Sequence, residues 1–408
     1  MSGLNQTPNS NRLHIAIFGK RNVGKSSLIN AITNQDIAIV SEHAGTTTDP
    51  VYKAMEILPI GPVVIIDTAG IDDTGALGEL RVQKSMEVIK KTDIALVVVT
   101  AAGLSEYDNE IIKTLTENKI EHIIVINKID ENKPDDEFLK KLKDAGNKVI
   151  MVSALQKEGI TELKQAVIKY SPKSFEQPSI LGDLIKPGDT VVLVIPIDTG
   201  MPKGRLILPQ VQTIRDILDS DALTYITKER ELRWAISNLK QPPKLVVTDS
   251  QAFLKVSADT PQDIMLTSFS ILFARYKGDL MSLVKGAKAL KNLKPGDRVL
   301  IAESCTHHQQ PDDIGRVKLP RWIRQHIEEK VEFDFYSGCN YPKNLRDYKV
   351  VIHCAGCMLN RKEMLSRIEA SLEQEVPIVN YGVAIACIHG ILERALKPFP
   401  EVYAEWID

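Results

Sequence analysis

A glycine-rich loop near the start of the chain constrains the fold more than any other stretch. An apolar run at residues 13–18 leads directly into GKRNVGKSS, and apolar residues at helical spacing follow. Gly19 and Gly24 enclose the variable part of the pattern G-x-x-x-x-G-K-S, and Lys25 and Ser26 complete it in the required strand–loop–helix context. In such loops backbone N–H groups bind phosphates at a helix N-terminus, while the lysine neutralises phosphate charge and the serine hydroxyl suits Mg²⁺. The sequence therefore predicts a P-loop nucleotide-binding domain.

Two later motifs point to GTP as the nucleotide. DTAG ends an apolar strand, so we expect Asp67 to hold Mg²⁺ through water and the Gly70 N–H to contact the γ-phosphate. NKID ends another strand, where Asn127 and Asp130 can bind guanine and the stem of Lys128 can cover its ring. A carboxylate accepts two hydrogen bonds from guanine, whereas adenine has no such pair of donors. An ATPase or a decayed nucleotide-binding fold is the alternative.

The segments around these motifs refine the expected chemistry. GTTTD at residues 45–49 resembles the GTTRD of other GTPases, which makes Thr47 the best candidate to bind Mg²⁺ and sense the γ-phosphate. Ile71 follows DTAG where Ras-like enzymes have the glutamine that orients water, so we expect slow turnover. With Asn22 in the P-loop, the chain resembles potassium-activated GTPases of tRNA modification and ribosome assembly, in which this asparagine ligates K⁺. A solvated loop asparagine is the alternative.

These motifs define a predicted nucleotide site. Its catalytic members are Lys25, Thr47, Asp67 and Gly70, and Ser26 and Thr47 are the expected Mg²⁺ ligands. Ser153 and Ala154 follow the strand at residues 149–152 and form the usual turn behind the base. The full set of expected contacts is Gly19, Asn22, Val23, Gly24, Lys25, Ser26, Ser27, Thr47, Asp67, Asn127, Lys128, Asp130, Ser153 and Ala154.

Length and charge limit the remaining possibilities. At roughly 150 residues per domain, 408 residues suggest two or three domains. The formal net charge is -2, so no positive excess favours nucleic acid or an anionic membrane as a partner. The polar N-terminus does not resemble a secretory signal, and no apolar run is long enough to span a bilayer. We therefore expect a cytoplasmic protein.

Alternating strand and helix patterns predict an α/β fold with three α/β domains, an N-terminal P-loop GTPase followed by two smaller parallel-sheet domains. We expect a GTPase domain over residues 1–172, a middle α/β domain over 173–265 and a cysteine-bearing α/β domain over 266–408. The middle domain carries no phosphate loop or ligand cluster, which favours packing or subunit association as its role. Helices are predicted over residues 228–239 and 268–293.

All five cysteines lie in the last 104 residues of the chain. Cys305 follows the predicted strand at residues 298–303, and Cys354 and Cys357 follow the one at residues 349–353. The carboxyl ends of neighbouring parallel strands open onto one crevice, so these three thiols are expected to converge there. Cys387 lies on an apolar helix face and is expected to be a buried thiol.

The cysteines and two histidines form the pattern C-x-H followed by H-C-x-x-C. A C-x-x-C pair chelates one metal or cluster, and a third thiolate completes a tripod. Zinc prefers four closed ligands, Cys₃His, and could use His307 or His353, whereas an iron–sulfur cluster accepts three cysteines and an exchangeable fourth position. A redox disulfide and unliganded core thiols are further alternatives. The spacing leaves zinc and iron–sulfur equally open.

The whole chain resembles the HydF family, the maturation GTPases of (FeFe)-hydrogenases, through the GTPase motifs, the C-terminal Cys/His pattern and the loop PIDTGMPKGRLILPQ. The resemblance implies a 4Fe-4S cluster on Cys305, Cys354 and Cys357, with His307 or His353 as a possible fourth ligand. It also implies that residues 173–265 are a dimerisation domain and that residues 266–408 are an iron–sulfur cluster-binding domain. The resulting homodimer would receive a di-iron precursor made with two radical-SAM maturases and deliver it to apo-hydrogenase. A potassium-dependent GTPase of RNA modification or ribosome assembly with a structural zinc domain is the alternative.

Overall fold

The chain forms two compact units, Met1–Glu176 and Gln177–Asp408. The computed structural model describes residues 8–33, 51–68, 85–172, 179–197, 206–304, 313–327, 331–338 and 341–408. Across these ranges no helix has both the length and the apolar character that crossing a bilayer demands.

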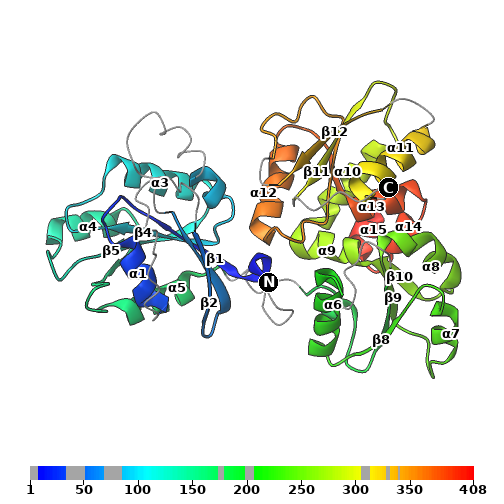
Figure 1. Ribbon diagram of the computed structural model, residues 1–408, viewed down its shortest axis with the longest axis horizontal. Coiled ribbons are helices and arrows are strands. Elements are labelled where there is room, and N and C mark those ends of the chain that lie inside the picture. The colour runs from blue at the N-terminus through cyan, green and yellow to red at the C-terminus, as the bar shows by residue number, and fades with distance from the viewer. Residues whose placement is uncertain are drawn as a thin grey trace. The chain divides into compact units, whose positions relative to one another are not determined.

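The first unit is built around a six-stranded sheet with the order β2-β3-β1-β4-β5-β6 (Figure 1). Its neighbouring strands are parallel, apart from the antiparallel pair β2 and β3. Strands β1 and β4 are buried along their whole length because helices cover both faces of the sheet. The strands are β1 (Leu13–Phe18), β2 (Val51–Ile57), β3 (Gly61–Asp67), β4 (Ile94–Val99), β5 (Glu121–Ile126) and β6 (Lys148–Met151).

Two apolar cores lie on the two faces of this sheet. Successive side chains of a strand point to opposite faces, so Ile15 and Ile17 of β1 join one core and Ala16 and Phe18 the other. Helices α1 and α5 contribute to the first core, and α3 and α4 to the second. These helices are α1 (Lys25–Thr33), α3 (Glu106–Glu117), α4 (Asp136–Asp144) and α5 (Ile160–Tyr170).

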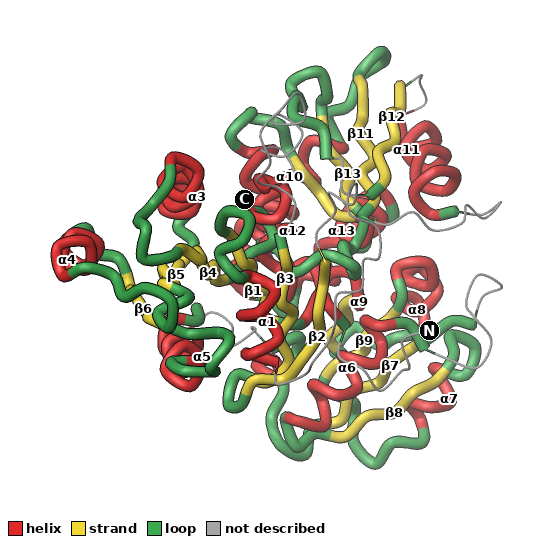
Figure 2. The backbone as a smooth tube through the Cα atoms, turned by 60° about the vertical axis from the view of Figure 1, so that its left-hand side comes forward, coloured by secondary structure: helices red, strands yellow, loops and turns green. Residues whose placement is uncertain are grey.

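The second unit contains two four-stranded parallel sheets, with the orders β10-β9-β7-β8 and β12-β11-β13-β14. The fold class is therefore the expected one, a P-loop domain followed by parallel-sheet domains. In Figure 2 the strands β11, β12 and β13 lie side by side. The strands are β7 (Thr190–Val194), β8 (Leu223–Thr227), β9 (Leu245–Thr248), β10 (Met265–Ser268), β11 (Arg298–Glu303), β12 (Glu332–Ser337), β13 (Val350–His353) and β14 (Ile378–Asn380).

A single apolar core connects the two sheets of the second unit. It includes Val192 of β7 and Ile301 of β11, with Phe273 of α9 and Leu283 of α10. The junction expected between residues 265 and 266 falls inside β10, which pairs with β9. The helices are α6 (Leu208–Asp219), α7 (Leu232–Ser237), α8 (Phe253–Asp259), α9 (Phe269–Lys277), α10 (Leu280–Leu290), α11 (Leu319–Ile327), α12 (Arg361–Leu372), α13 (Tyr381–Ile388), α14 (Leu392–Leu396) and α15 (Pro400–Ile407). A short π-helix, η5 (Ile314–Lys318), precedes α11.

The continuous helix predicted over residues 268–293 is two helices, α9 and α10. Asp279 caps the second one, because its Oδ2 accepts a hydrogen bond from the Ser282 N–H at 3.1 Å. Such a cap satisfies an N–H that a continuous helix would bond internally. The apolar spacing continues across the break, which is why the pattern did not reveal it.

The edge strand β8 is absent from the sequence-based expectations. It reads LTYIT, a β-branched and aromatic run that favours a strand, but three of its side chains are exposed and no buried alternation marks it. The helix expected at residues 228–239 is the shorter α7.

Candidate functional site: a P-loop and a cysteine centre

The loop between β1 and α1 depends on two glycines. Gly19 has φ +141°, and a Cβ there would collide with the backbone oxygen of Val98. Gly24 has φ +92°, and a Cβ there would collide with the side-chain amide of Asn127. These backbone angles and close approaches exclude larger residues, so the loop can wrap tightly around an anion.

Lys25 is the first residue of α1, and only 6% of it is exposed. Its Nζ donates to the carbonyl oxygens of Gly19 and, at 2.9 Å, of Lys20. Ser26 follows half-buried, and Ser27 is exposed. The ammonium and the Ser26 hydroxyl therefore lie at the N-terminus of a helix, where the backbone dipole also favours anions.

Asn127 connects three predicted motifs. Its Nδ2 donates to the Val23 carbonyl at 2.8 Å, and its Oδ1 accepts from the Ala154 N–H at 3.0 Å. Ser153 is fully buried, and its Oγ accepts from the Gln156 N–H at 3.1 Å. The asparagine thus joins the P-loop to the turn expected behind the base, a structural role that the motif alone does not reveal.

The remaining predicted nucleotide residues are placed as follows. Asp67 ends β3, is 2% exposed and pairs in register with Ile17 of β1, two residues before Gly19. Lys128 has φ +64°, and Asp130 is exposed beyond β5. Asn22 is exposed, with φ +66°. Thr47 and Gly70 lie outside the described residues.

The cysteine pair lies at the carboxyl end of the second sheet in the second unit. Strand β13 pairs in parallel with β11, with His353 opposite Ala302. The Cys354 N–H continues this ladder and donates to the Ala302 carbonyl at 2.8 Å. Ser304 then donates from its backbone N–H to the Cys354 Sγ at 3.2 Å, and the Ser304 Oγ lies 3.2 Å from the same sulfur. Ser304, the residue before Cys305 in the sequence, therefore lies directly beside Cys354.

The loop from Cys354 to Asn360 has a defined shape. Gly356 has φ +62°, a Cβ there would press on the Met364 Cε, and its N–H lies 3.4 Å from the Cys354 Sγ. Asn360 ends the loop by capping α12, since its Oδ1 accepts from the Glu363 N–H at 2.9 Å. Both thiols therefore sit on backbone that is fixed at each end.

His353, a predicted candidate ligand, is fully buried, and both of its ring nitrogens have partners. Its Nε2 lies 3.0 Å from Nη1 of Arg367, which can only donate, so Nε2 is the acceptor. Its Nδ1 then carries the proton and donates to the Cys354 carbonyl at 2.8 Å. Ligation by His353 would break the contact with Arg367. Cys305 and His307 lie outside the described residues.

Lys277 is a residue of this centre that sequence reasoning missed. It ends α9, is 2% exposed, and its Nζ donates to the carbonyls of Cys357 at 3.0 Å and Leu359 at 2.9 Å. Burial lowers the pKa of Lys277 to about 8, while Cys357 and Cys354 act in the opposite direction. A lysine in the apolar run FSILFARYK was the available signal, since charged residues are rarely fully buried without a partner.

The two thiols differ electrostatically. Burial opposes ionisation of Cys354, whereas the hydrogen bonds between Ser304 and its sulfur act in the opposite direction and lower the pKa. Burial, followed by the proximity of Cys354, raises the pKa of Cys357. Cys354 is therefore the sulfur that the surroundings prepare as a thiolate, the form that binds metals.

A second polar group lies at the same end of this sheet. Glu303 ends β11 and is 5% exposed, and its carboxylate accepts hydrogen bonds from Arg316, Ser337 and Tyr381 at 3.2–3.3 Å. The hydroxyl of Tyr381 packs against Gly315 so closely that a Cβ there would overlap it. Burial, with Cys354 and Glu303 nearby, raises the Tyr381 pKa well above its usual value.

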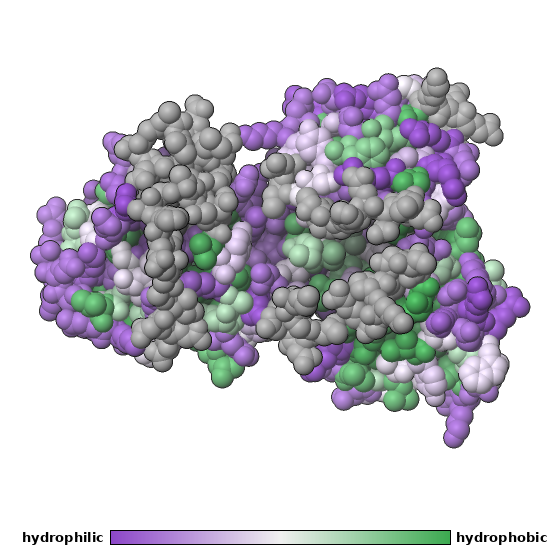
Figure 3. Space-filling view, viewed as in Figure 1, coloured by the Kyte–Doolittle hydropathy of each residue, from purple (hydrophilic) through white to green (hydrophobic). Residues whose placement is uncertain are grey.

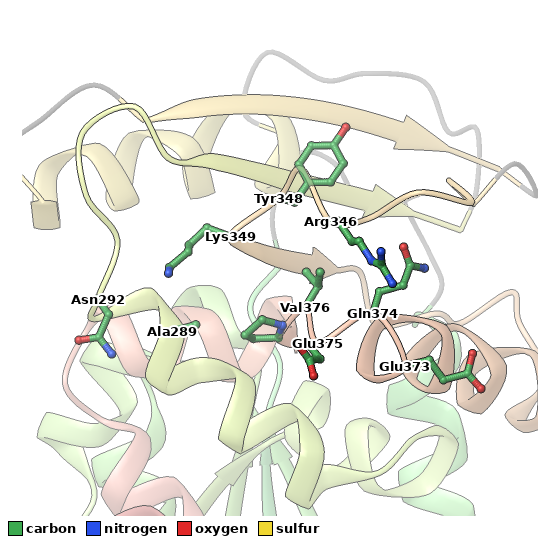
Figure 4. A pocket seen from close by; sticks show the side chains of 10 residues that line it. Ala289, Asn292, Arg346, Tyr348, Lys349, Glu373, Gln374, Glu375 and Val376 are labelled. Carbon is green, nitrogen blue, oxygen red and sulfur yellow. The ribbon is translucent and has the colours of Figure 1, made fainter.

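No group of three or more His, Cys, Asp or Glu side chains in the described part of the chain is arranged to hold a metal ion. A pocket of about 830 Å³ opens instead at the other end of the same sheet, where β13 and β14 begin (Figure 4). Arg346, Lys349, Glu373 and Pro377 contribute to its lining. None of the predicted site residues that the structure describes lines this pocket.

Comparison with known families finds a matching family model for each part of this architecture. A model described as "50S ribosome-binding GTPase" matches residues 14–128. "Hydrogen maturase F dimerization domain" matches residues 180–278, and "Hydrogen maturase F tetramerization domain" matches residues 281–398. Fold, P-loop and these matches define a GTPase that continues into two oligomerisation domains with parallel sheets. The chain belongs to the hydrogen maturase F (HydF) family.

Individual relatives match the GTPase unit. The tRNA modification GTPase MnmE of Aquifex aeolicus (strain VF5) is 38% identical over 165 residues, 40% of this chain and 35% of that protein. MnmE of Clostridioides difficile (strain 630) is 40% identical over 159 residues, 38% of this chain and 34% of that protein. The chain therefore spans about a third of the length of these relatives.

Solved GTPase structures are also similar. Era of Aquifex aeolicus, bound to GDP·AlF₄⁻, is 22% identical, with 61% of this chain and 99% of that chain covered and a TM-score of 0.35. The G domain of the Thermotoga maritima FeoB iron transporter is 23% identical, with 39% and 98% covered and a TM-score of 0.31.

Proposed function

We propose that the chain is a GTP-hydrolysing scaffold that holds a 4Fe-4S cluster on Cys305, Cys354 and Cys357. It would carry the di-iron precursor of the hydrogenase active site and deliver it to apo-hydrogenase. Membership of the HydF family supports this role, because the matched family models are described as domains of a hydrogen maturase. GTP and Mg²⁺ are implied by the GTPase domain.

One observation carries the cluster part of the proposal, namely the contact between Ser304 and the Cys354 sulfur at 3.2 Å. Cys305 directly follows Ser304 in the sequence, and this adjacency supports its assignment as the third thiol of the centre. Three thiolates and an open position suit an iron–sulfur cluster, whereas zinc prefers four closed ligands. His353 is engaged on both nitrogens, which argues against its use as the fourth zinc ligand. When bound, the cluster would supply an iron with an exchangeable coordination position.

The partners that we propose follow from the family and not from geometry. They are apo-hydrogenase as the recipient and two radical-SAM maturases as the source of the precursor. The matched dimerization and tetramerization domains support self-association, and we propose a homodimer formed through the middle domain. Nucleic acid and membranes are not among the proposed partners, because the formal net charge of -2 gives no excess of positive charge.

The test is anaerobic reconstitution of the full chain, followed by iron and sulfide analysis and electron paramagnetic resonance of the reduced protein. We expect iron and sulfide in the 4Fe-4S ratio, and we expect Cys305→Ala to lose most of both. Cys387→Ala is the matched control, because Cys387 is a buried thiol on α13 whose Sγ lies 3.7 Å from the Ala287 carbonyl.

Two results would contradict the cluster proposal. One is a full cluster in Cys305→Ala. The other is zinc as the sole stoichiometric metal, which would favour the alternative, a potassium-dependent GTPase of RNA modification or ribosome assembly with a structural zinc domain. The sequence identity with MnmE is the observation that favours this alternative, although the matched residues cover the GTPase unit alone.

A further inference from the structure

We propose that Lys277 is a positioning residue of the cysteine centre. It holds the loop from Cys354 to Asn360 through the carbonyls of Cys357 and Leu359, and it keeps a positive charge next to the loop that carries both sulfurs. Such a charge would favour the reduced state of a bound cluster. The inference rests on the proposed function, because it assumes that these cysteines hold an iron–sulfur cluster.

The ammonium group of Lys277 is buried. Lys277 is 2% exposed and ends α9, where a cation also complements the negative end of the helix dipole. Its contacts are the carbonyls of Cys357 and Leu359, which are neutral acceptors. A buried charge is costly unless an opposite charge balances it. In a loaded centre Cys354 and Cys357 would bind as thiolates, which would supply negative charge in the loop that Lys277 contacts.

Side chains from both sides join the cysteine loop and the start of α12 to the end of α9. Arg361, the first residue of α12, donates from Nη1 to the carbonyls of Arg275 at 3.1 Å, Tyr276 at 2.7 Å and Gly278 at 2.9 Å. The last carbonyls of a helix lack partners within the helix, so Arg361 supplies them. Lys277 runs the other way, from the end of α9 to the loop. The cysteine loop is thus tied to α9 by two cations.

The two cations differ in what they face. Lys277 donates to the carbonyl of Cys357, a cysteine of the centre, whereas the carbonyls that Arg361 contacts lie at the end of α9. Both therefore hold the backbone of the loop, but Lys277 has the additional charge effect. Reduction adds negative charge to a cluster, and a nearby fixed cation favours the more negative state. Removal of Lys277 should therefore make reduction less favourable, whereas removal of Arg361 should only loosen the loop.

The experiment uses the full chain, reconstituted anaerobically as wild type, Lys277→Met, Lys277→Gln, Lys277→Arg and Arg361→Gln. The readouts are iron and sulfide content, the thermal midpoint and the midpoint potential from a redox titration followed by electron paramagnetic resonance. We expect Lys277→Met to lower the equilibrium constant of one-electron reduction about tenfold, a potential about 59 mV more negative. Lys277→Arg and Arg361→Gln should stay within about threefold of wild type.

Lys277→Gln separates folding from charge, because its amide can still donate to a carbonyl but carries no charge. If Lys277→Met loses the cluster, the same tenfold effect is expected in Lys277→Gln. An unchanged potential in both neutral variants overturns the inference while the cluster proposal stands. Equal shifts in Lys277→Met and Arg361→Gln also overturn it, since the effect would then come from the loop alone. A wild-type protein that binds no iron and sulfide refutes the proposed function itself.

Discussion

Asn127 and His353 show how a side chain can take on a task that its motif does not suggest. Asn127 belongs to a guanine-binding motif, yet it joins the P-loop at Val23 to the turn at Ala154. His353 belongs to a Cys/His pattern, yet it fixes the Cys354 carbonyl while Arg367 holds its other nitrogen. Each contributes to a site by holding backbone in place, independent of any direct contact with a ligand.

Asn22 is the residue through which the expected potassium site can be tested. It is exposed in the P-loop, where its backbone has φ +66°. We expect GTP turnover to be about tenfold or more faster in K⁺ than in Na⁺, because a cation at the phosphates acts where charge develops in the transition state. Asn22→Gly should abolish the difference without strain, since glycine accepts a positive φ. Steady-state phosphate release in both salts provides the measurement.

A matched control for this prediction is Asn118→Gly, at the exposed C-cap of α3. It changes the same residue type outside the loop and should preserve the response to K⁺. Equal rates in K⁺ and Na⁺ for the wild-type protein would remove the argument for a potassium site.

The sequence predicts residues of local motifs well and residues with distant partners poorly. Gly19, Gly24 and Lys25 lie within seven consecutive positions, so their spacing alone defines the loop. Lys277 reaches carbonyls 80 and 82 residues away, and no local pattern encodes that contact. The pairing of β11 with β13 was predictable only in part. Carboxyl ends of parallel strands lie at one edge of a sheet, but this rule does not establish which strands are neighbours.

At the scale of elements, the close approach of α10 to β14 sets the position of the second sheet. Gly286 lies within α10, and a Cβ there would overlap the carbonyl of Ile378 in β14. The helix can therefore contact the strand's backbone directly. The sequence predicted helix and strand here, but neither their contact nor the break at residue 278, because apolar spacing does not report interhelical geometry.

Gly286→Ala tests this contact. We expect the free energy of unfolding to fall by roughly 1–3 kcal/mol, because the added methyl group forces α10 away from β14 and overpacks the core. Denaturant unfolding followed by circular dichroism measures the effect. Lys285→Ala, at the neighbouring exposed position, should change the free energy by less than about 0.5 kcal/mol. A neutral or stabilising Gly286→Ala would contradict the close packing.

At the scale of the whole molecule, the first sheet of the second unit ends in an edge strand with apolar side chains. Leu223, Tyr225 and Ile226 of β8 are 50–57% exposed. Figure 3 shows apolar surface gathered in the region of this strand. Exposed apolar edges favour pairing with another chain, and the family model that covers β8 is described as a dimerization domain. This edge is therefore the surface through which we expect two copies to associate.

Ile226→Lys should weaken that association. A charge on an edge strand opposes pairing, and we expect the dimer dissociation constant to rise about tenfold or more, which corresponds to about 1.4 kcal/mol. Size-exclusion chromatography with light scattering over a dilution series gives the constant. Leu254→Lys on α8, a residue 54% exposed outside the sheet, is the control and should leave the constant unchanged. A dimer that is unaffected by Ile226→Lys would place the interface elsewhere.

The single core beneath both sheets of the second unit has a consequence for how such proteins diversify. Side chains from β7 and from β11 are buried in the same cluster, so neither sheet has a complete interior of its own. A gene fragment that encoded only one of the two matched domains would expose apolar surface that its neighbour now covers. Recombination should therefore exchange the GTPase unit more readily than either half of the second unit, and the two halves should be inherited as one block.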